Sequence, residues 1–541
     1  MRVRLLGAVA LAVAAMLPSF RAQAATSPWA LIAHEPTFMS GSPGAMFLLT
    51  NGRVLVQDQG ANNGGGAQWW LYSPDAKGGY QDGTWSPTGS LPSGYAPEYF
   101  ASGVMPDGRV VIEGGEFNGT GTFVATHDGA VYDPATGVWA PLAPPSGGSG
   151  CWSTIGDAPS VVLASGTFFM GSSGTDASTC AALLDASSLT WTTTGAGKGD
   201  PYPEEGFTLL PNGDVLDVNT GVTSGTPGGV RSTETYDPQT GTWSSAGDTP
   251  SALDSSGEVG PAALMPDGVV FAEGATSATA LYDTATGTWS AGPTMPSVGG
   301  QQLTATDACS AVLPNGNVLF DASPDMQVGT HWFVYNGSAI SQISDDAALS
   351  SSSERSNFCN ALDLPNGQVL VNERAGATPM EVFTPSGAPD PSWAPTVSST
   401  PSTVVVGRSY SIQGTQFGGL DEGASFGDDY NPQSNYPLVR VTNRVSGRVT
   451  YARTSGSTGL SVGPGTPGST TFVLPASAPD GPSTLQVVVN GIASTPSAVS
   501  VTGGAAAPRP ARIVTLTCVR GRALRRVRGR HPRCPTGWRL R

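Results

Sequence analysis

Seven copies of one short pattern run through this chain of 541 residues and restrict what it can fold into. Each copy is an apolar stretch, a turn that ends in Gly, and a second apolar stretch. The turn glycines lie 47 to 58 residues apart, at Gly52, Gly108, Gly166, Gly213, Gly268, Gly316 and Gly367. Asn-Gly and Asp-Gly turns between apolar runs strongly indicate a β-hairpin, because both turn positions need positive φ. The repeat therefore predicts seven hairpins in an all-β fold.

A second pattern follows most of the hairpins, and it consists of an aromatic or apolar residue, a polar turn and then Trp. It ends at Trp139, Trp191, Trp243 and Trp289, with a longer version at Trp85. Four short strands per repeat and a period near fifty residues indicate a β-propeller, whose blades bury their faces by stacking around a ring. The seventh copy lacks its strand with Trp. The segment 27–32, which contains Trp29, resembles that strand, so we expect it to complete the last blade.

These repeats resemble kelch motifs, and the whole arrangement over residues 27–502 resembles the galactose oxidase-like proteins. That resemblance implies a seven-bladed β-propeller followed by an immunoglobulin-like domain. After Pro395 the short alternating strands are typical of a β-sandwich, and the motif GTQF at 414–417 resembles the IPT/TIG modules of secreted bacterial proteins. The expected parts are a signal peptide at 1–24, the propeller at 25–394, the β-sandwich at 395–502, and a linker with a basic two-cysteine tail at 503–541.

The first residues predict export. Two arginines and an apolar run at 5–17 precede an A-x-A site at 22–24, with cleavage expected before Ala25. No later stretch reaches the roughly 18 apolar residues of a membrane span. We therefore expect an extracellular protein, either free or held at the cell surface.

Six cysteines, an even number, suit an oxidising compartment. Many pairings are possible, and proximity in the chain favours three of them. These are Cys151 with Cys180 inside the third repeat, Cys309 with Cys359 on neighbouring inner strands, and Cys518 with Cys534 in the tail.

The net charge of -15 is distributed unevenly. The signal holds three arginines and the segment from Ala505 holds eleven, with no acid in either, so 12 of the 26 basic groups and all 41 acidic groups lie between them. Such an acidic body disfavours nucleic acid as a partner. The basic tail is expected to contact anionic envelope material or the protein's own acidic body, or it is only a solubilising end. Two lysines, Lys77 and Lys198, accompany 24 arginines, which we interpret as coding bias.

The galactose oxidase-like copper enzymes use a tyrosine cross-linked to a cysteine, a Tyr-His pair from the propeller and a final His from the C-terminal domain. Copper needs those imidazoles. The histidines of this chain are His34, His127, His331 and His531; none follows a Tyr, and none lies between the last two. Copper is therefore not expected as a cofactor, and no catalytic residue is assigned. Motifs of the commoner hydrolases and nucleotide enzymes are also missing.

Acidic residues recur at matched positions of the repeats. Where the first strand of a repeat is expected to begin stand Glu98, Asp157, Glu204 with Glu205, Glu258 and Asp307, followed by Asn357 in the last copy. Where the second strand is expected to end stand Glu113, Asp217, Glu273 and Asp321, with Glu373 one residue further on. Antiparallel neighbours put the start of one strand beside the end of the next. Both sets should therefore gather on one face around the central channel.

This acidic face has two interpretations. The candidate ligand or cation site, made of Glu98, Glu113, Glu204, Glu258, Glu273, Asp307 and Asp321, would hold Ca²⁺ or hydrogen-bond sugar hydroxyls. Exposed aromatic residues would flank it, such as Tyr95, Tyr99, Tyr202 and Phe117. Alternatively, each carboxylate accepts backbone N–H bonds from the adjoining blade. A second oxygen-rich loop contains Asp421, Glu422 and residues 427–431; it could also hold Ca²⁺, but it lacks EF-hand spacing, so a solvated loop is favoured.

The sequence therefore predicts an exported kelch-type propeller that binds a carbohydrate, a surface polymer or a protein without chemistry of its own. Ca²⁺ is the one cofactor considered. The alternative is a divergent copper-radical oxidoreductase of the galactose oxidase-like group, and a third class is a purely structural surface protein. Metal content and peroxide production on alcohols or aldehydes separate the first two.

Overall fold

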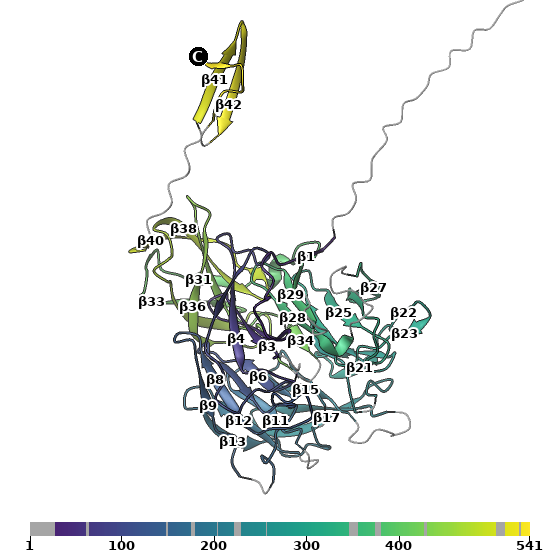
Figure 1. The fold of residues 1–541 in the computed structure, drawn as a ribbon. Coiled ribbons are helices and arrows are strands. Elements are labelled where there is room, and N and C mark those ends of the chain that lie inside the picture. The colour runs from purple at the N-terminus through teal and green to yellow at the C-terminus, as the bar shows by residue number, and fades with distance from the viewer. Residues whose placement is uncertain are drawn as a thin grey trace, which may run out of the picture.

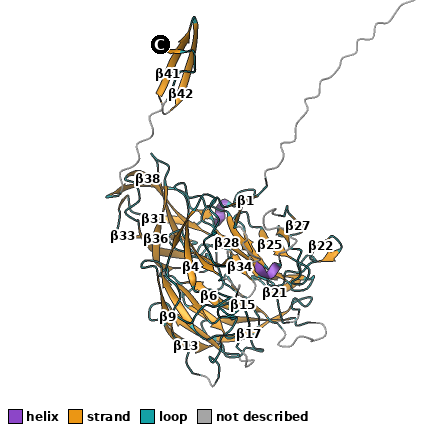
Figure 2. Cartoon of the chain, in the orientation of Figure 1, coloured by secondary structure: helices purple, strands orange, loops and turns teal. Residues whose placement is uncertain are grey.

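The computed structural model describes residues 27–60, 64–147, 150–174, 179–202, 204–220, 229–255, 257–345, 355–373, 380–422, 424–426, 430–504, 514–529 and 532–541. This part of the chain is all-β apart from two short 3-10 helices, η1 (Ser356–Phe358) and η2 (Pro391–Trp393) (Figures 1 and 2). Within it, no helix is long and apolar enough to cross a membrane. The predicted all-β class is confirmed.

Seven sheets share one arrangement, an antiparallel meander of four strands. The first sheet holds β2 (Pro43–Leu48), β3 (Val54–Asp58), β4 (Gln68–Ser73) and β5 (Thr84–Pro87). The second holds β6 (Ala101–Val104), β7 (Val110–Glu113), β8 (Gly129–Asp133) and β9 (Val138–Leu142). The third holds β10 (Ser160–Val162), β11 (Phe168–Gly171), β12 (Ala181–Asp185) and β13 (Thr190–Thr194).

The later sheets follow the same plan, although the sixth and seventh each recruit a strand from elsewhere in the chain. The fourth holds β14 (Phe207–Leu209), β15 (Val215–Val218), β16 (Ser232–Asp237) and β17 (Thr242–Asp248), and the fifth holds β18 (Ala262–Leu264), β19 (Val269–Glu273), β20 (Thr279–Asp283) and β21 (Thr288–Ala291). The sixth holds β24 (Cys309–Val312), β25 (Val318–Ala322), β26 (His331–Tyr335) and β27 (Ile340–Gln342). The seventh holds β28 (Cys359–Asp363), β29 (Val369–Glu373) and β30 (Glu381–Phe383), and a small hairpin of β22 (Ser297–Val298) and β23 (Gln301–Gln302) precedes the sixth sheet.

Turn chemistry explains why each repeat forms these strands. Gly52, in the first hairpin turn, has φ 75° and donates its N–H to the carbonyl of Leu49 at 2.8 Å, a conformation that glycine adopts without a steric penalty. The turns before the strands of Trp139, Trp191, Trp243 and Trp289 are each held by an aspartate. Asp237, for example, accepts the N–H of Gln239 at 2.7 Å through its side chain and that of Gly241 at 2.8 Å through its carbonyl.

The seven sheets form a closed ring. Their first strands contact one another in the order β2, β6, β10, β14, β18, β24 and β28, and β28 contacts β2. The fourth strand of the seventh sheet is β1 (Trp29–Leu31), which pairs antiparallel with β30 so that Trp29 lies opposite Phe383. The Trp29 ring is buried, lies 4.8 Å from both Trp332 and Phe383, and donates its N–H to the carbonyl of Ser344 at 2.9 Å. The predicted closing role of this segment is confirmed, and the ring is consistent with a β-propeller.

A separate sheet of nine strands follows the ring in the chain. Its strand order is β31 (Thr396–Ser399), β33 (Ser409–Thr415), β37 (Pro467–Val473), β36 (Val449–Thr458), β35 (Leu438–Asn443), β38 (Gly481–Val489), β40 (Ser497–Thr502) and β32 (Thr403–Val405), with β39 (Ile492–Ala493) beside β38. It has its own apolar core, which includes Ile412, Val439 and Phe472. It also packs on the ring, because Thr50 donates its hydroxyl to the carbonyl of Thr454 at 2.8 Å.

One short strand from beyond the ring returns to the ring interior. β34 (Ala424–Phe426) pairs antiparallel with β24, placing Phe426 opposite Cys309, and it also contacts β18 and β28. Just before it, Asp421 and Glu422 are buried, and Glu422 accepts the N–H of Leu209 at 2.9 Å. The favoured solvated loop is therefore wrong for these two residues, because the segment enters the protein; residues 427–429 of the proposed Ca²⁺ loop lie outside the described residues.

Three disulfides join Cys151 to Cys180, Cys309 to Cys359 and Cys518 to Cys534, which are the pairs preferred from the sequence. Disulfides of this kind are typical of extracellular proteins. The last one belongs to a C-terminal sheet of β41 (Val514–Arg520), β42 (Ala523–Gly529) and β43 (Arg539–Leu540). In Figure 1 the chain reaches this sheet through residues 505–513, which are not described.

Candidate functional site

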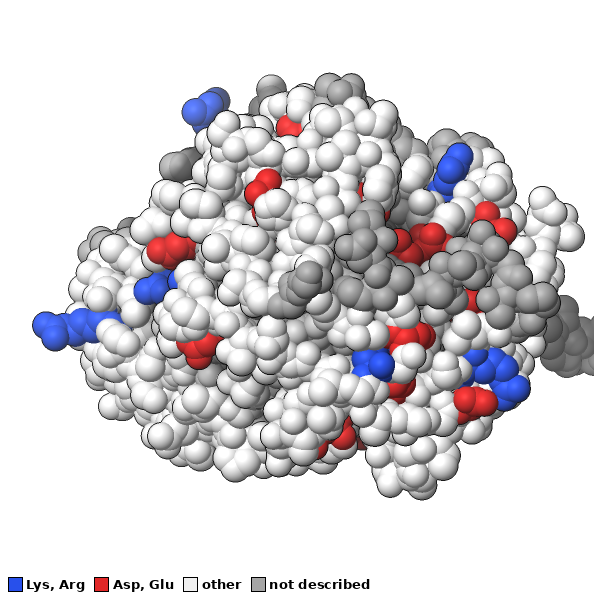
Figure 3. All heavy atoms as spheres, turned by 90° about the horizontal axis from the view of Figure 1, so that it is seen from below, with Lys and Arg blue, Asp and Glu red and all other residues white. Residues whose placement is uncertain are grey.

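The predicted carboxylates lie mostly inside the ring of sheets. All four acids at the ends of second strands, Glu113, Asp217, Glu273 and Asp321, are fully buried. Among the residues at strand starts, Glu98, Asp157, Glu205 and Asp307 are also buried, whereas Glu204, Glu258 and Asn357 are partly exposed. The side chain of Glu373 is outside the described part of the protein. Figure 3 shows one face of the molecule, on which acidic and basic side chains are scattered over a mostly uncharged surface and several of them lie side by side.

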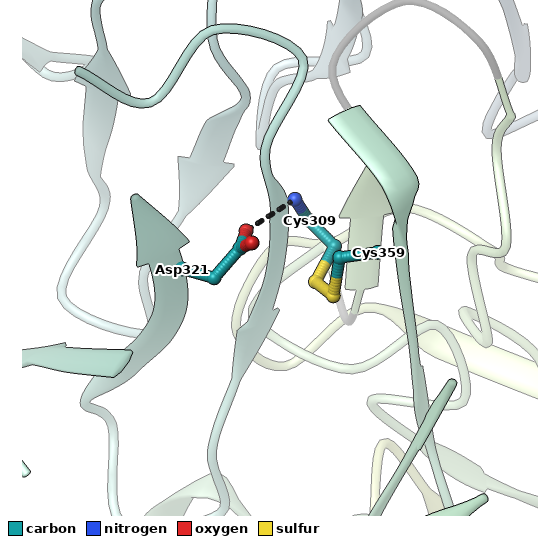
Figure 4. A group of neighbouring side chains, drawn as sticks. All are labelled: Cys309, Asp321 and Cys359. Carbon is teal, nitrogen blue, oxygen red and sulfur yellow. Dashed lines mark hydrogen bonds between the residues drawn. A yellow bond between two sulfur atoms is a disulfide. The ribbon is translucent and has the colours of Figure 1, made fainter. Parts of the chain in front are cut away.

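Possible metal ligands come close together at one place in the described part of the ring. Among the described residues, a single group of three possible metal ligands lies within 4.8 Å, and it consists of Cys309, Asp321 and Cys359 (Figure 4). Its two cysteines form a disulfide, and Asp321 accepts the N–H of Cys309 at 3.1 Å. The disulfide joins the sixth sheet to the seventh, so this group has a structural role.

Glu273 and Asp321 are buried acids on neighbouring sheets. Burial, together with the charge of Asp321, raises the pKa of Glu273 well above its usual value, and burial does the same to the pKa of Asp321. The Glu113 carboxyl is similar, because burial and the charge of Asp128 raise its pKa. Neither carboxylate oxygen of Glu113 or Glu273 has a hydrogen-bond partner among the described residues. Burial therefore favours the neutral form of both carboxyl groups.

Neutral side chains make hydrogen bonds between neighbouring sheets of the ring. The Gln57 amide donates to the carbonyl of Pro97 at 2.7 Å, the Thr208 hydroxyl to that of Ala262 at 2.8 Å, and the Asn372 amide to that of Gly44 at 3.0 Å. In contrast, Asp321 accepts its backbone bond from its own sheet. Amides and a hydroxyl therefore tie neighbouring sheets at these three positions.

The fourth sheet contains a buried ion cluster that the sequence analysis missed. The Lys198 ammonium lies between four carboxylates, at 2.8 Å from Asp200, 3.2 Å from Glu205, 3.0 Å from Asp217 and 3.0 Å from Glu234. We call these five residues the lysine cage. The rings of Tyr202 and Trp243 lie 5.1 and 5.3 Å from the ammonium, which favours a cation there. The Lys198 side chain has no exposed surface.

Electrostatics in the cage favour the charged lysine. Burial lowers the pKa of Lys198, but the carboxylates of Asp217, Glu205 and Asp200 outweigh it and hold that pKa well above its ordinary range. Burial raises the pKa of Asp200 to about 6 against the opposing effect of Lys198, and burial with the charge of Asp217 raises the pKa of Glu205. The reading of Lys198 as coding bias missed this role. The signal available in the sequence was a lysine close to several acidic residues, in a chain that has 24 arginines and only one other lysine.

A group of aromatic side chains lies at the start of β6 and the end of β7. Ring centroids are 6.0 Å apart for Tyr99 and Phe117, 6.4 Å for Phe117 and Phe123, and 6.0 Å for Tyr99 and Tyr430. The Tyr430 hydroxyl accepts the N–H of Tyr99 at 3.0 Å. We call these four residues the aromatic cluster. It is next to the Glu98–Glu116 bridge, where the Glu98 N–H donates to the Glu116 carbonyl at 3.1 Å.

The aromatic cluster combines exposure with an unusual backbone. Tyr99 has φ 51° and Phe117 has φ 55°, values that a bulky side chain rarely adopts. Phe123 is 60% exposed, while Tyr99 and Phe117 are partly exposed. The expected exposure of Tyr95 and Tyr202 is wrong. Both are buried: the Tyr95 hydroxyl donates to the carbonyl of Gly114 at 3.0 Å, and Tyr202 packs against the lysine cage.

The histidines do not form a copper site in the described structure. His34 and His127 each contact a backbone carbonyl, of Gly83 at 2.7 Å and of Ser153 at 2.9 Å, and His331 contacts Asp345 at 2.7 Å. His531 lies outside the described residues. Because the described imidazoles are not grouped with one another, this donor set does not fit the copper centre that the family resemblance implies.

Comparisons with known proteins add little at the level of sequence. No protein-family profile matches the chain, and no curated protein matches it. Among solved structures, the chain is similar to a fungal alcohol oxidase of the AA5 family in complex with copper, with 15% identity and a TM-score of 0.47 over 88% of this chain and 99% of that one. It is also similar to the extracellular domain assigned to a hybrid two-component system of B. thetaiotaomicron, with 11% identity and a TM-score of 0.44 over 67% of this chain and 40% of that one.

Proposed function

We propose that the protein is an exported seven-bladed kelch-type propeller, with its immunoglobulin-like sandwich at 395–502, that binds a carbohydrate or a sugar-containing surface polymer at the aromatic cluster. The observation that carries this proposal is the left-handed backbone of Tyr99 and Phe117 beside the exposed ring of Phe123. Strained backbone of this kind costs about 1–3 kcal/mol per residue and concentrates at functional sites.

The chemistry of the cluster suits a sugar. Aromatic rings offer flat apolar faces, and a binding site adds a few polar groups that fix the orientation of the ligand. Glu98 and Glu116 lie directly beside Tyr99 and Phe117 in the chain and pair through their backbones.

A glycan array tests this proposal, with the protein applied in the presence and in the absence of Ca²⁺. Phe123→Ala should weaken binding at least tenfold, since an exposed ring that stacks on a sugar contributes more than about 1.4 kcal/mol. Phe38→Ala is the matched control, because Phe38 is an exposed aromatic residue, 44% accessible, far along the chain from the cluster. Equal binding by both variants, or no glycan binding by the native protein, would overturn the proposal.

A separate activity assay tests the copper-oxidase alternative. The described histidines do not support it, and peroxide production from alcohols or aldehydes by the copper-loaded protein would replace the binding proposal with an oxidase.

The basic tail is proposed to hold the protein to anionic envelope material. In β42 the side chains of Arg525 and Arg526 are exposed, and clustered arginines bind polyanions in a salt-dependent way. Removal of residues 505–541 should release the protein from such material. Binding that survives both this truncation and high salt would exclude the tail as the anchor.

A further inference from the structure

The lysine cage also contains an amide. Besides its four carboxylates, the Lys198 Nζ lies 3.3 Å from the side-chain oxygen of Asn219. We propose that Lys198 and Asn219 condense to form an intramolecular isopeptide bond between Nζ and Cγ, with release of ammonia. This inference is independent of the proposed binding function.

The geometry brings the two reacting groups together and keeps water out. The Asn219 side-chain N–H donates to the Ser232 hydroxyl at 3.1 Å, so the amide is held with its oxygen toward the lysine. The Lys198 side chain is fully buried and Asn219 is 4% exposed. The rings of Tyr202 and Trp243 cover the cage. Holding two groups in contact in a dry site replaces a bimolecular reaction with an intramolecular one.

Buried carboxylates supply the proton transfers that the reaction needs. One proton of the Lys198 ammonium moves to Glu205 or Asp217, whose oxygens lie 3.2 and 3.0 Å away. The freed electron pair of Nζ attacks Cγ of Asn219. A second Nζ proton is carried to Nδ2 as the Cγ–Nδ2 bond breaks, ammonia leaves, and the first proton stays on the carboxylates. No oxidant, reductant or further reactant is required.

The carboxylates have two opposing effects on the rate at which the isopeptide bond forms. Burial raises the pKa values of Glu205 and Asp217, which makes them effective proton acceptors for this step. The same acids stabilise the ammonium form, so the amine is free only rarely. We therefore expect slow bond formation after folding, because the pocket must first exist.

The choice of lysine in the cage agrees with this chemistry. The chain has 24 arginines and two lysines. A guanidinium would supply the same positive charge to the four carboxylates, but it lacks the nucleophilic amine. The other lysine, Lys77, is exposed and donates to the carbonyl of Ser446 at 2.9 Å, so it provides an internal control.

The mass of the full native chain tests the proposal. After reduction and denaturation, the purified protein should be lighter than its mature sequence by the mass of one ammonia. Trypsin does not cut after an acylated lysine, so residues 110–231, which contain no basic residue before Arg231 except Lys198, should remain one peptide with the same loss. Amine labelling of the denatured protein should modify Lys77 and leave Lys198 unmodified. A full mass together with cleavage after Lys198 would overturn the proposal.

Two variants identify the partners of the bond. Lys198→Arg keeps the charge, and Asn219→Ala keeps the amine, yet both should have the full mass, and Asn219→Ala should be cut after residue 198. A loss of one water instead of one ammonia, retained in Asn219→Ala, would assign the bond to an aspartate or glutamate of the cage and overturn the role of Asn219. If either variant fails to fold, the mass of the native protein still shows whether the chain has lost one ammonia.

Discussion

Buried acids at the same position of two repeats are neutralised in different ways. In the fourth sheet, Asp217 at the end of β15 is paired with the Lys198 ammonium at 3.0 Å. In the fifth sheet, Glu273 at the end of β19 has no hydrogen-bond partner among the described residues, and burial raises its pKa, which favours the neutral form. One site holds a charge with a countercharge, and the other avoids the charge. An acid that recurs at a matched position is therefore no guarantee of a shared function.

The ion pair of Asp217 and the buried acid Glu273 are destabilised by different changes. Removing one partner of a buried ion pair leaves an uncompensated charge in the interior, which is strongly destabilising. A neutral buried acid lacks that risk, but it becomes unfavourable when it ionises. The neighbouring sheets beside Asp321 are instead joined covalently, by the Cys309–Cys359 disulfide.

The largest expected effect is the loss of the cation. Lys198→Met should lower the free energy of unfolding by about 3–5 kcal/mol, because the four carboxylates of the cage then have neither an ammonium nor a bond to Asn219 beside them. Urea denaturation measures the change. Lys77→Met is the matched control and should stay within about 0.5 kcal/mol, since Lys77 is exposed. Equal stability of the two variants would show that the cage is not a structural ion cluster.

The second effect concerns the covalent joint between the sixth and seventh sheets. Replacing Cys309 and Cys359 with Ala should cost about 2–4 kcal/mol, because the bridge spans 50 residues and restricts the unfolded chain. The same change at Cys518 and Cys534 is the control, and it should leave the denaturation curve of the ring unchanged, because that pair lies in the C-terminal sheet. If neither replacement changes the stability of the ring, the Cys309–Cys359 disulfide does not stabilise it.

A smaller effect should appear as a pH dependence. The folded-state pKa of Glu273 is raised, so its stabilising contribution is complete below its unfolded pKa, near 4.3, and is lost as the pH rises through the higher folded value. Stability should therefore fall toward alkaline pH. Glu273→Gln should flatten this slope and match the native protein at low pH. Thermal unfolding at a series of pH values measures it, and an unchanged slope would mean that Glu273 is already ionised.

The smallest expected effect is that of Ca²⁺. If the Glu273–Asp321 pair takes up the ion only weakly, a concentration near the dissociation constant stabilises the fold by about 0.4 kcal/mol. A small rise in melting temperature with Ca²⁺, reversed by a chelator and absent from Glu273→Gln, would support this. If the double change Glu98→Gln with Glu258→Gln removes the response instead, the cation lies at the strand starts, which form one part of the site predicted from the sequence.

Local patterns predicted the architecture well because each has a short-range physical cause. The Asn-Gly and Asp-Gly turns located the first hairpins, and the strand-like segment around Trp29 indicated the partner of β30. The site was harder to predict, since burial depends on contacts far apart in the chain. Tyr95 and Tyr202 were expected to be exposed, yet both are buried. The lysine cage combines residues from three segments of one repeat, and no periodic pattern marks Lys198.

The pairing of β34 with β24 has a consequence for the order in which the sheets are completed as the chain is synthesised from its N-terminus. The sixth sheet holds β24 to β27. Its strand β24 also pairs with β34, which lies more than a hundred residues later in the chain. In contrast, the partner of β30 in the seventh sheet is β1, which precedes it in the chain and is therefore already available when β30 forms. A partly synthesised chain can therefore form the early sheets, while one edge of β24 stays unpaired until residues 424–426 appear. The ring and the nine-stranded sheet should consequently reach their native state, and lose it, in one cooperative step.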